Sequence, residues 1–279
     1  MTVIPDLPHT DYLKMPALSV SGMKQLLPPS CPALFKHYRE NRRPEKHAYD
    51  IGHVAHGLIL GDGPEVVIVD AGDWRTKYAR ELRENAYAEG KVPVLLSEYE
   101  QCAAMAASVR SNPTAADLLA DGKPEQTLTW TDSTGVPMRA RVDWLPNARP
   151  GRRFTAVDLK TTGGSAHPTE FARAAAKFNY CMQARHYLDG IKACGLDDDP
   201  AFVLVVVETS APYLVSLVQF TDEDLQIGAE KIAAAVQIYR GCIESGSWPG
   251  YGEEIATIEM PAWYRMDHER DVIEEMEIG

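Results

Sequence analysis

The stretch that most constrains the fold of this sequence is a run of three predicted β-strands that follow one another without an intervening helix. The segments EQTLTWT (125–131), PMRARVDWLP (137–146) and RFTAVDLKTT (153–162) are rich in β-branched and aromatic residues. The residues DSTG (132–135) between the first two segments are typical of a hairpin turn. We therefore predict a β-meander at the centre of the chain.

Helices are predicted before this meander, and helices and strands after it. The spacing of apolar residues predicts helices over 19–27, 31–43, 48–60, 74–89, 97–109, 113–119, 168–194 (one helix or two) and 222–245. Ser19 or Ser21 is the expected N-cap of the first helix, and Ser97 with Glu100 resembles a capping box. Further strands are expected over 65–70, 201–209 and 213–220, and the first 15 residues, rich in proline, are expected to be irregular. The order predicts an α/β fold with a central mixed sheet flanked by helices.

The sequence contains neither an internal repeat nor a clear linker. We expect one domain over 1–251, with a helical N-terminal part at about 16–120 and a core at about 121–245, followed by an acidic tail over 252–279.

The net charge of −12 at first argues against a nucleic-acid partner. The tail from residue 252 onward holds nine acidic and two basic residues, however, so it carries −7 and leaves −5 for the remainder. A metal-binding pocket would also add negative charge. Contact with DNA is therefore compatible with the charge.

Cysteine usage and hydropathy exclude several other classes. The five cysteines are scattered singly, without a CxxC pair, which argues against a zinc ribbon or an iron–sulfur cluster. The longest apolar run is too short to span a bilayer, and the start of the chain lacks the pattern of a secretory signal. We expect a cytoplasmic protein without membrane contact.

Three residues in the meander suggest a catalytic site. Asp158 and Lys160 lie two apart on one predicted strand, so their side chains point to the same face. Asp143, at the end of RARVD, can reach that face if the two strands are antiparallel neighbours. Two carboxylates suit Mg²⁺ or Mn²⁺, and a lysine can orient or deprotonate a water or offset charge on a phosphoryl group. The alternative interpretation is a surface salt bridge at the strand ends.

The motifs in this order resemble the PD-(D/E)xK nuclease superfamily, and within it the RecE-type (exonuclease VIII) phage and prophage exonucleases. RVDWLP, VDLKTT and QARHY carry the core of the resemblance. It extends from about residue 18 to residue 220 through SVSGMKQLL, SCPALFKHY, IGHVAHGLIL, DWRTKYARELRENAYAEGK and PEQTLTWTD. It implies a restriction-endonuclease-like core. One departure is Asp158, where the superfamily often has glutamate.

The resemblance also implies roles for individual residues. It implies one or two Mg²⁺ ions per site, with Mn²⁺ as an alternative, held by His56, Asp143, Asp158 and the backbone carbonyl of Leu159. The catalytic set that it implies comprises Asp143, Asp158, Lys160, Glu125, Gln183 and Tyr187. Other readings remain open: His56 can be a structural histidine, and Gln183 and Tyr187, which share a helix face, can simply pack.

Positive charge is concentrated around the second predicted helix and along the helix after Asp73. The residues expected to contact DNA are Ser19, Ser21, Lys24, Arg42, Arg43, Arg75, Lys77 and Arg80. Ser19 and Ser21, at a helix start, could bind a 5′-terminal phosphate. Glu81 and Glu84 lie among the bases after Asp73, so a solvated, ion-paired helix face is the alternative there.

Together with the resemblance, these features predict a metal-dependent exodeoxyribonuclease, and the resemblance implies that it acts on double-stranded DNA ends. The resemblance implies 5′ to 3′ digestion that leaves a 3′ single strand for an annealing protein in phage-type recombination, and a ring-shaped homo-oligomer. One alternative is another nuclease of the superfamily, either single-strand-specific or endonucleolytic. The other is a non-catalytic DNA-binding or scaffold protein, against which the intact Asp143, Asp158 and Lys160 argue.

Overall fold

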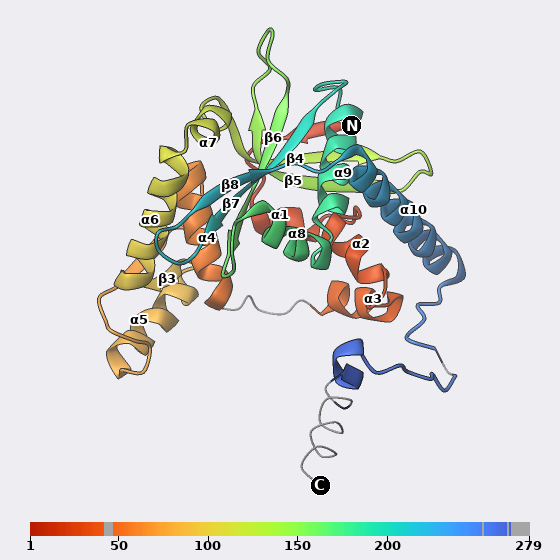
Figure 1. The fold of residues 1–279 in the computed structure, drawn as a ribbon, viewed down its shortest axis with the longest axis horizontal. Helices are drawn as coiled ribbons and strands as arrows, with labels where there is room; N and C mark the ends of the chain where they lie inside the picture. The colour runs from red at the N-terminus through yellow and green to blue at the C-terminus, as the bar shows by residue number, and fades with distance from the viewer. Residues whose placement is uncertain (42–46, 253, 267, 269–279) are drawn as a thin grey trace. The chain divides into compact units, whose positions relative to one another are not determined.

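The computed structural model describes residues 1–41, 47–252, 254–266 and 268 (Figure 1). The chain divides into two compact units, Met1–Trp248 and Pro249–Gly279. The described part of the second unit holds one short helical turn over 262–266 and exposed apolar side chains, including those of Ile255 and Trp263.

A six-stranded sheet forms the centre of the first unit, with the strand order β1-β4-β5-β6-β7-β8. The strands are β1 (Thr2–Ile4), β4 (Gly122–Thr131), β5 (Pro137–Pro146), β6 (Thr155–Thr162), β7 (Ala201–Glu208) and β8 (Val215–Val218). Strands β6 and β7 pair in parallel, and the other neighbours pair antiparallel. The sheet is therefore mixed, which confirms the predicted fold class.

Helices cover the sheet, and a second, parallel sheet of two strands lies among them (Figure 1). The helices are α1 (His9–Lys14), α2 (Val20–Leu26), α3 (Pro32–Glu40), α4 (His47–Leu60), α5 (Lys77–Ala88), α6 (Leu96–Ser111), α7 (Pro113–Leu118), α8 (Pro168–Lys177), α9 (Tyr180–Ala193) and α10 (Asp222–Ser245). The small sheet consists of β2 (Val66–Val69) and β3 (Val92–Leu95). In the described part of the chain, no helix is both long enough and apolar enough to cross a bilayer.

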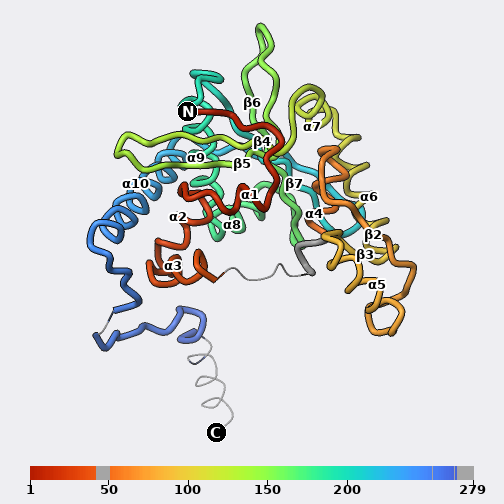
Figure 2. The backbone as a smooth tube through the Cα atoms, turned by 180° about the vertical axis from the view of Figure 1, so that it is seen from behind, coloured from red at the N-terminus to blue at the C-terminus, as the bar shows by residue number. Residues whose placement is uncertain are grey.

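Each face of the large sheet has its own hydrophobic core. Strand β7 is buried on both sides: Leu204 and Val206 pack in one core with residues of α2, α9 and α10, whereas Val203 and Val205 pack in the other with residues of α4 and α6. Such a continuous apolar run is typical of a strand that helices cover on both faces. Both views show α9 and α10 on one side of the sheet and α4 and α6 on the other (Figures 1 and 2).

Three local features differ from the sequence-based expectations. The first 15 residues are not irregular, because β1 pairs with β4 and α1 follows it. Strand β3 was not predicted, since four residues between two helices give little periodicity. Helix α6 begins at Leu96, and Glu98, rather than Glu100, accepts a hydrogen bond from the Leu95 backbone at 2.8 Å. Ser97 is therefore not the N-cap, because the chain enters the helix directly from β3.

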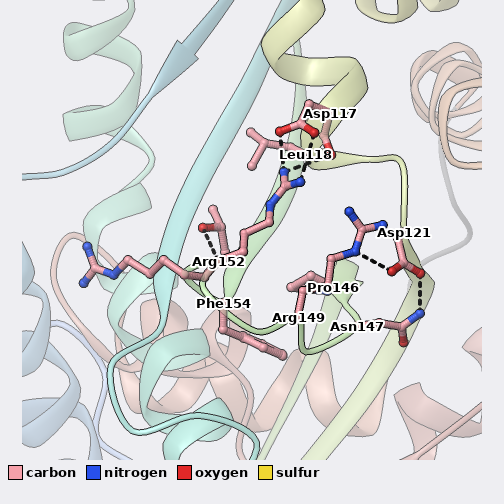
Figure 3. A pocket seen from close by; sticks show the side chains of 10 residues that line it. Asp117, Leu118, Asp121, Pro146, Asn147, Arg149, Arg152 and Phe154 are labelled. Carbon is pink, nitrogen blue, oxygen red and sulfur yellow. Dashed lines mark hydrogen bonds and ion pairs between the residues drawn. The ribbon is translucent and has the colours of Figure 1, made fainter.

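Ion pairs fasten the connection between β5 and β6 to the end of α7 (Figure 3). The Arg152 guanidinium is paired with the Asp117 carboxylate, and Arg149 and Asn147 both donate to Asp121 at 2.6 Å. These groups are largely exposed, so each pair contributes little stability. Together they connect the segment between β5 and β6 to residues at and just after the end of α7.

The buried His186 makes the stability of this core depend on pH. Its Nε2 lies 2.8 Å from the Arg139 carbonyl oxygen, and its ring centroid is 4.7 Å from that of Trp130. Because a carbonyl only accepts, Nε2 carries the proton of a neutral ring. Burial lowers the pKa of His186 to about 4. The unfolded chain therefore takes up a proton, at its ordinary pKa near 6.5, that the folded chain does not.

We predict that stability decreases as the pH falls from 8 to 5, with His186 alone removing about 2 kcal/mol of unfolding free energy. Urea denaturation at both pH values measures this loss. The variant His186→Gln should lose correspondingly less, while the exposed His167→Gln should behave like the wild type. An equal loss in wild type and His186→Gln would show that another group causes the dependence.

Candidate active site

Asp158 and Lys160 point from β6 toward α9, on the same side as Ala156, as the strand alternation predicts. The Asp158 side chain is only 1 % exposed. Its Oδ1 accepts a hydrogen bond from Gln183 Nε2 at 2.6 Å, and its Oδ2 is ion-paired with the Lys160 amino group. A carboxylate this deeply buried requires such partners, because an unpaired charge in the interior is costly.

The charge state of Lys160 follows from its neighbours. Burial lowers the pKa of its amino group, but the carboxylates of Asp158 and Asp143 outweigh burial, so the pKa is raised above its usual value. Lys160 is therefore an ammonium at neutral pH. In this form it can stabilise negative charge or donate a hydrogen bond, but it cannot remove a proton from water.

Gln183 and Tyr187 lie one turn apart on α9 and form one hydrogen-bonded chain with Asp158. Gln183 Nε2 donates to Asp158 and lies 3.1 Å from the hydroxyl oxygen of Tyr187. Both side chains are buried. Burial, together with the negative charge of Asp158, raises the pKa of Tyr187 well above its usual value, so the hydroxyl stays neutral. The structure thus brings both residues to the site, where Gln183 holds the carboxylate of Asp158.

Asp143 joins the same site from β5. The register pairs Trp144 with Val157, and the Asp143 carboxylate accepts a hydrogen bond from the Leu159 N–H at 2.8 Å. The side chain therefore satisfies a backbone donor of β6 at a point where the neighbouring strand would otherwise do so. Burial, followed by repulsion from Asp158, raises the pKa of Asp143 well above its usual value. A cation at this position would relieve that repulsion.

Glu125 lies opposite Asp143 across the β4–β5 pair. The register pairs Pro124 with Trp144 and Gln126 with Val142, which places Glu125 between them at the level of Asp143. Glu125 has a positive φ of 53° in the left-handed region, which non-glycine residues rarely adopt inside a strand. Such strain persists where the surrounding structure enforces it, often at a functional site.

Arg141 neutralises Glu125 and connects it to the N-terminal segment. Its Nε is ion-paired with Glu125 Oε2, and its Nη1 donates to the Leu7 carbonyl oxygen at 2.8 Å. Arg141 was not among the residues predicted from the sequence. Its position two residues before Asp143, on the same face of the strand, is the pattern that could have identified it.

His56 reaches the site from α4, across the sheet from α9. Its Nδ1 lies 3.7 Å from Asp143 Oδ2, and its Nε2 lies 3.2 Å from the Leu159 carbonyl oxygen. Burial lowers the pKa of His56, more than its acidic neighbours raise it. The ring is therefore neutral at pH 7 and can offer a nitrogen lone pair to a metal ion.

His56, Glu125 and Asp143 form a possible metal site. One ligand atom of each lies within 4.8 Å of the others. One imidazole nitrogen and two carboxylate oxygens are a suitable donor set for Mn²⁺, and the carboxylates suit Mg²⁺. The group does not include Asp158, which we expected to be a metal ligand. In the structure its carboxylate contacts Gln183 and Lys160.

The predicted DNA-contacting residues fall into three places. Ser19 caps α2 by accepting from the Gly22 N–H, and with Ser21 it lines a groove of about 550 Å³ beside α3 and the N-terminal segment. Lys24, on the same helix, lies beside Lys160 at the site. Arg42 and Arg43 lie outside the described residues.

The remaining predicted contacts are on or just before α5. Arg75, Lys77 and Arg80 are exposed. Arg75 is paired with Asp73 at 2.5 Å, and Lys77 is 3.6 Å from Glu81. In both views α5 lies at one end of the first unit, apart from α9 (Figures 1 and 2). The structure does not bring these three residues to the site.

Comparisons with known proteins identify a family and a similar fold. Residues 19–261 match the family described as a PDDEXK-like domain of unknown function (DUF3799). The fold is similar to that of a Eubacterium rectale protein described as a candidate exonuclease, known from a crystal structure at 2.19 Å resolution. The two chains share 11 % identity with a TM-score of 0.63, and the match covers 92 % of this chain and 96 % of the other. No curated protein matches the sequence.

We predict that divalent cations stabilise this protein through the His56–Glu125–Asp143 group. Binding to the folded state alone adds about 2.7 kcal/mol at a cation concentration 100 times the Kd. Thermal unfolding with Mn²⁺, Mg²⁺ or EDTA measures the shift. Asp143→Asn and Glu125→Gln should each lose most of it, while Glu84→Gln on the exposed face of α5 should keep it. A full shift in both site variants would place the cation elsewhere.

Proposed function

The chain belongs to the PDDEXK-like family of nuclease-related domains, and from this premise we propose that it is a metal-dependent nuclease that hydrolyses phosphodiester bonds of DNA. The observation that carries the proposal is that groups from several elements converge on residues 158–160 of β6. The Leu159 backbone contacts Asp143 and His56, and the flanking Asp158 and Lys160 form a buried ion pair. The candidate cation ligands Asp143 and His56 thus contact the residue that lies directly beside Lys160 in β6.

The residues suggest a division of work in phosphodiester hydrolysis. His56, Glu125 and Asp143 would hold a divalent cation, which when bound activates a water and polarises the phosphoryl group. Lys160, as an ammonium, would stabilise the negative charge that develops on the phosphoryl oxygens. Gln183 would keep Asp158 oriented, so that Lys160 stays at a fixed position. Such preorganised charges cost no reorganisation during the reaction.

We further propose that the enzyme is an exodeoxyribonuclease of the RecE type. The order of motifs from SVSGMKQLL to QARHY supports this, as does the fold shared with the candidate exonuclease from Eubacterium rectale. On this proposal it uses Mg²⁺ or Mn²⁺, digests double-stranded ends 5′ to 3′, assembles as a ring and hands a 3′ single strand to an annealing protein. Such a strand would serve phage-type recombination.

The first test is digestion of linear and covalently closed double-stranded DNA with Mg²⁺, Mn²⁺ or EDTA. We expect metal-dependent loss of the linear DNA only. Lys160→Ala should reduce the rate about 100-fold or more, because it removes a charge placed for the transition state. Lys192→Ala, at an exposed lysine near the end of α9, is the matched control and should keep full activity.

Other outcomes would select another function. Cutting of the closed circle would indicate an endonuclease. Activity on single strands alone would indicate a single-strand nuclease. No activity with any metal on any DNA would overturn the catalytic proposal and leave a DNA-binding or scaffold protein.

Polarity can be measured on a linear duplex in which one strand carries two different labels near its two ends. We expect the label near the 5′ end to be released first, and the opposite strand's 3′ end to survive as a single strand. Release of the 3′ label first would contradict 5′ to 3′ digestion while leaving the nuclease assignment intact. Sedimentation of the active protein would then test the proposed ring.

A further inference from the structure

Three lysine side chains from different elements gather where α9 begins. The amino nitrogens of Lys24 on α2 and Lys160 on β6 lie 5.5 Å and 5.0 Å from the centroid of the Tyr180 ring. Lys231 on α10 donates a hydrogen bond to the side-chain oxygen of Asn179, the residue before Tyr180. The lysine cluster, defined as Lys24, Lys160 and Lys231, thus surrounds the first residues of one helix.

The positive charge of this cluster exceeds the negative charge that pairs with it. Asp158 pairs with Lys160. Among the described residues, neither Lys24 nor Lys231 forms an ion pair with a carboxylate. Partial burial, followed by repulsion from Lys160, lowers the pKa of Lys24 to about 8. Like charges that lie close together and repel one another are typical of a site that binds an anion.

The fold contains specific features that bring these lysines together. A Cβ added at Gly228 on α10 would lie 2.7 Å from the carbonyl oxygen of Cys181, so glycine permits α10 to pack directly on the first turn of α9. Lys231 follows Gly228 by three residues, on the same helix face. Asn179 adopts a positive φ of 51°, which turns the chain sharply into α9. Lys231 therefore reaches the beginning of α9 because of local backbone geometry.

We propose that Lys24 and Lys231 form a phosphate-binding subsite beside Lys160, which holds a phosphate of the substrate strand next to the one that is cleaved. This rests on the proposed nuclease function and adds the residues that grip the strand. Ammonium groups bind phosphate oxygens without regard to base sequence. The subsite therefore positions the strand while Lys160 remains available for the reacting phosphate.

The test is the salt dependence of DNA binding by the full chain in EDTA, so that cleavage does not intervene. The anisotropy of an internally labelled duplex gives the Kd from 50 to 200 mM KCl. Each lost phosphate contact should reduce the slope of log K against log salt by about 0.9. We expect this reduction for Lys24→Met and for Lys231→Met, with weaker binding. Lys24→Arg, which keeps the charge, and Lys192→Met should resemble the wild type.

Two results would overturn the proposal. One is an unchanged slope in both methionine variants. The other is a Lys24→Arg variant as impaired as Lys24→Met, since this would assign the effect to packing rather than charge. Thermal unfolding tests whether each variant is folded. If Lys24→Met does not fold, the salt slope of Lys231→Met decides the proposal. Because binding is measured without cleavage, an absence of nuclease activity and an absence of this subsite give different results.

Comparing duplexes with 5′-phosphate and 5′-hydroxyl ends identifies which phosphate is bound. If the subsite grips a terminal phosphate, the methionine variants lose affinity only for the 5′-phosphorylated duplex. If it grips an internal phosphate, they lose affinity for both. Either pattern supports the lysine subsite, and the absence of any loss on both duplexes contradicts it.

Discussion

The site depends on the backbone of a single residue, Leu159. Its side chain is buried in the core beneath α4 and α6, its N–H donates to Asp143, and its carbonyl oxygen faces His56. Strand β6 is held between β5 and β7 and moves little, so it keeps Asp143 and His56 at fixed positions. Groups from both faces of the sheet meet here, where the Asp143 carboxylate accepts the hydrogen bond of the Leu159 N–H in place of regular strand pairing.

This arrangement is unfavourable in free energy because it removes charged side chains from water. Asp158 and Lys160 are buried together, and Asp143 lies close enough to Asp158 that the two repel. Hydrogen bonds from Gln183 and from the Leu159 N–H offset part of that cost. A divalent cation bound by these carboxylates would relieve the remaining repulsion, so this electrostatic imbalance would favour cation binding.

The sequence predicted the parts of this site that follow from local periodicity. Strand alternation placed Asp158 and Lys160 on one face, and the meander placed Asp143 on the neighbouring strand, as the structure shows. Helical spacing placed Gln183 and Tyr187 together. The approach of His56 is set by packing between α4 and the sheet, and only the family resemblance pointed to it. Neither Arg141 nor Lys231 was expected, because the positive φ of Glu125 within β4 and the close contact at Gly228 depend on neighbours distant in sequence. Strand β1 escaped prediction for the same reason, since three residues become a strand only by pairing with β4.

That short strand has a practical consequence for anyone who shortens or tags the chain. Strand β1 covers an edge of β4, and an uncovered edge is a template for intermolecular pairing. The residues just after it supply the Leu7 carbonyl that accepts from Arg141, the partner of Glu125. Removing these residues would therefore expose an unpaired edge of β4. It would also take away the Leu7 carbonyl that holds Arg141 beside Glu125, one of the candidate metal ligands. Aggregation and altered metal affinity would then share a single origin, and neither would report on the chemistry of the intact protein.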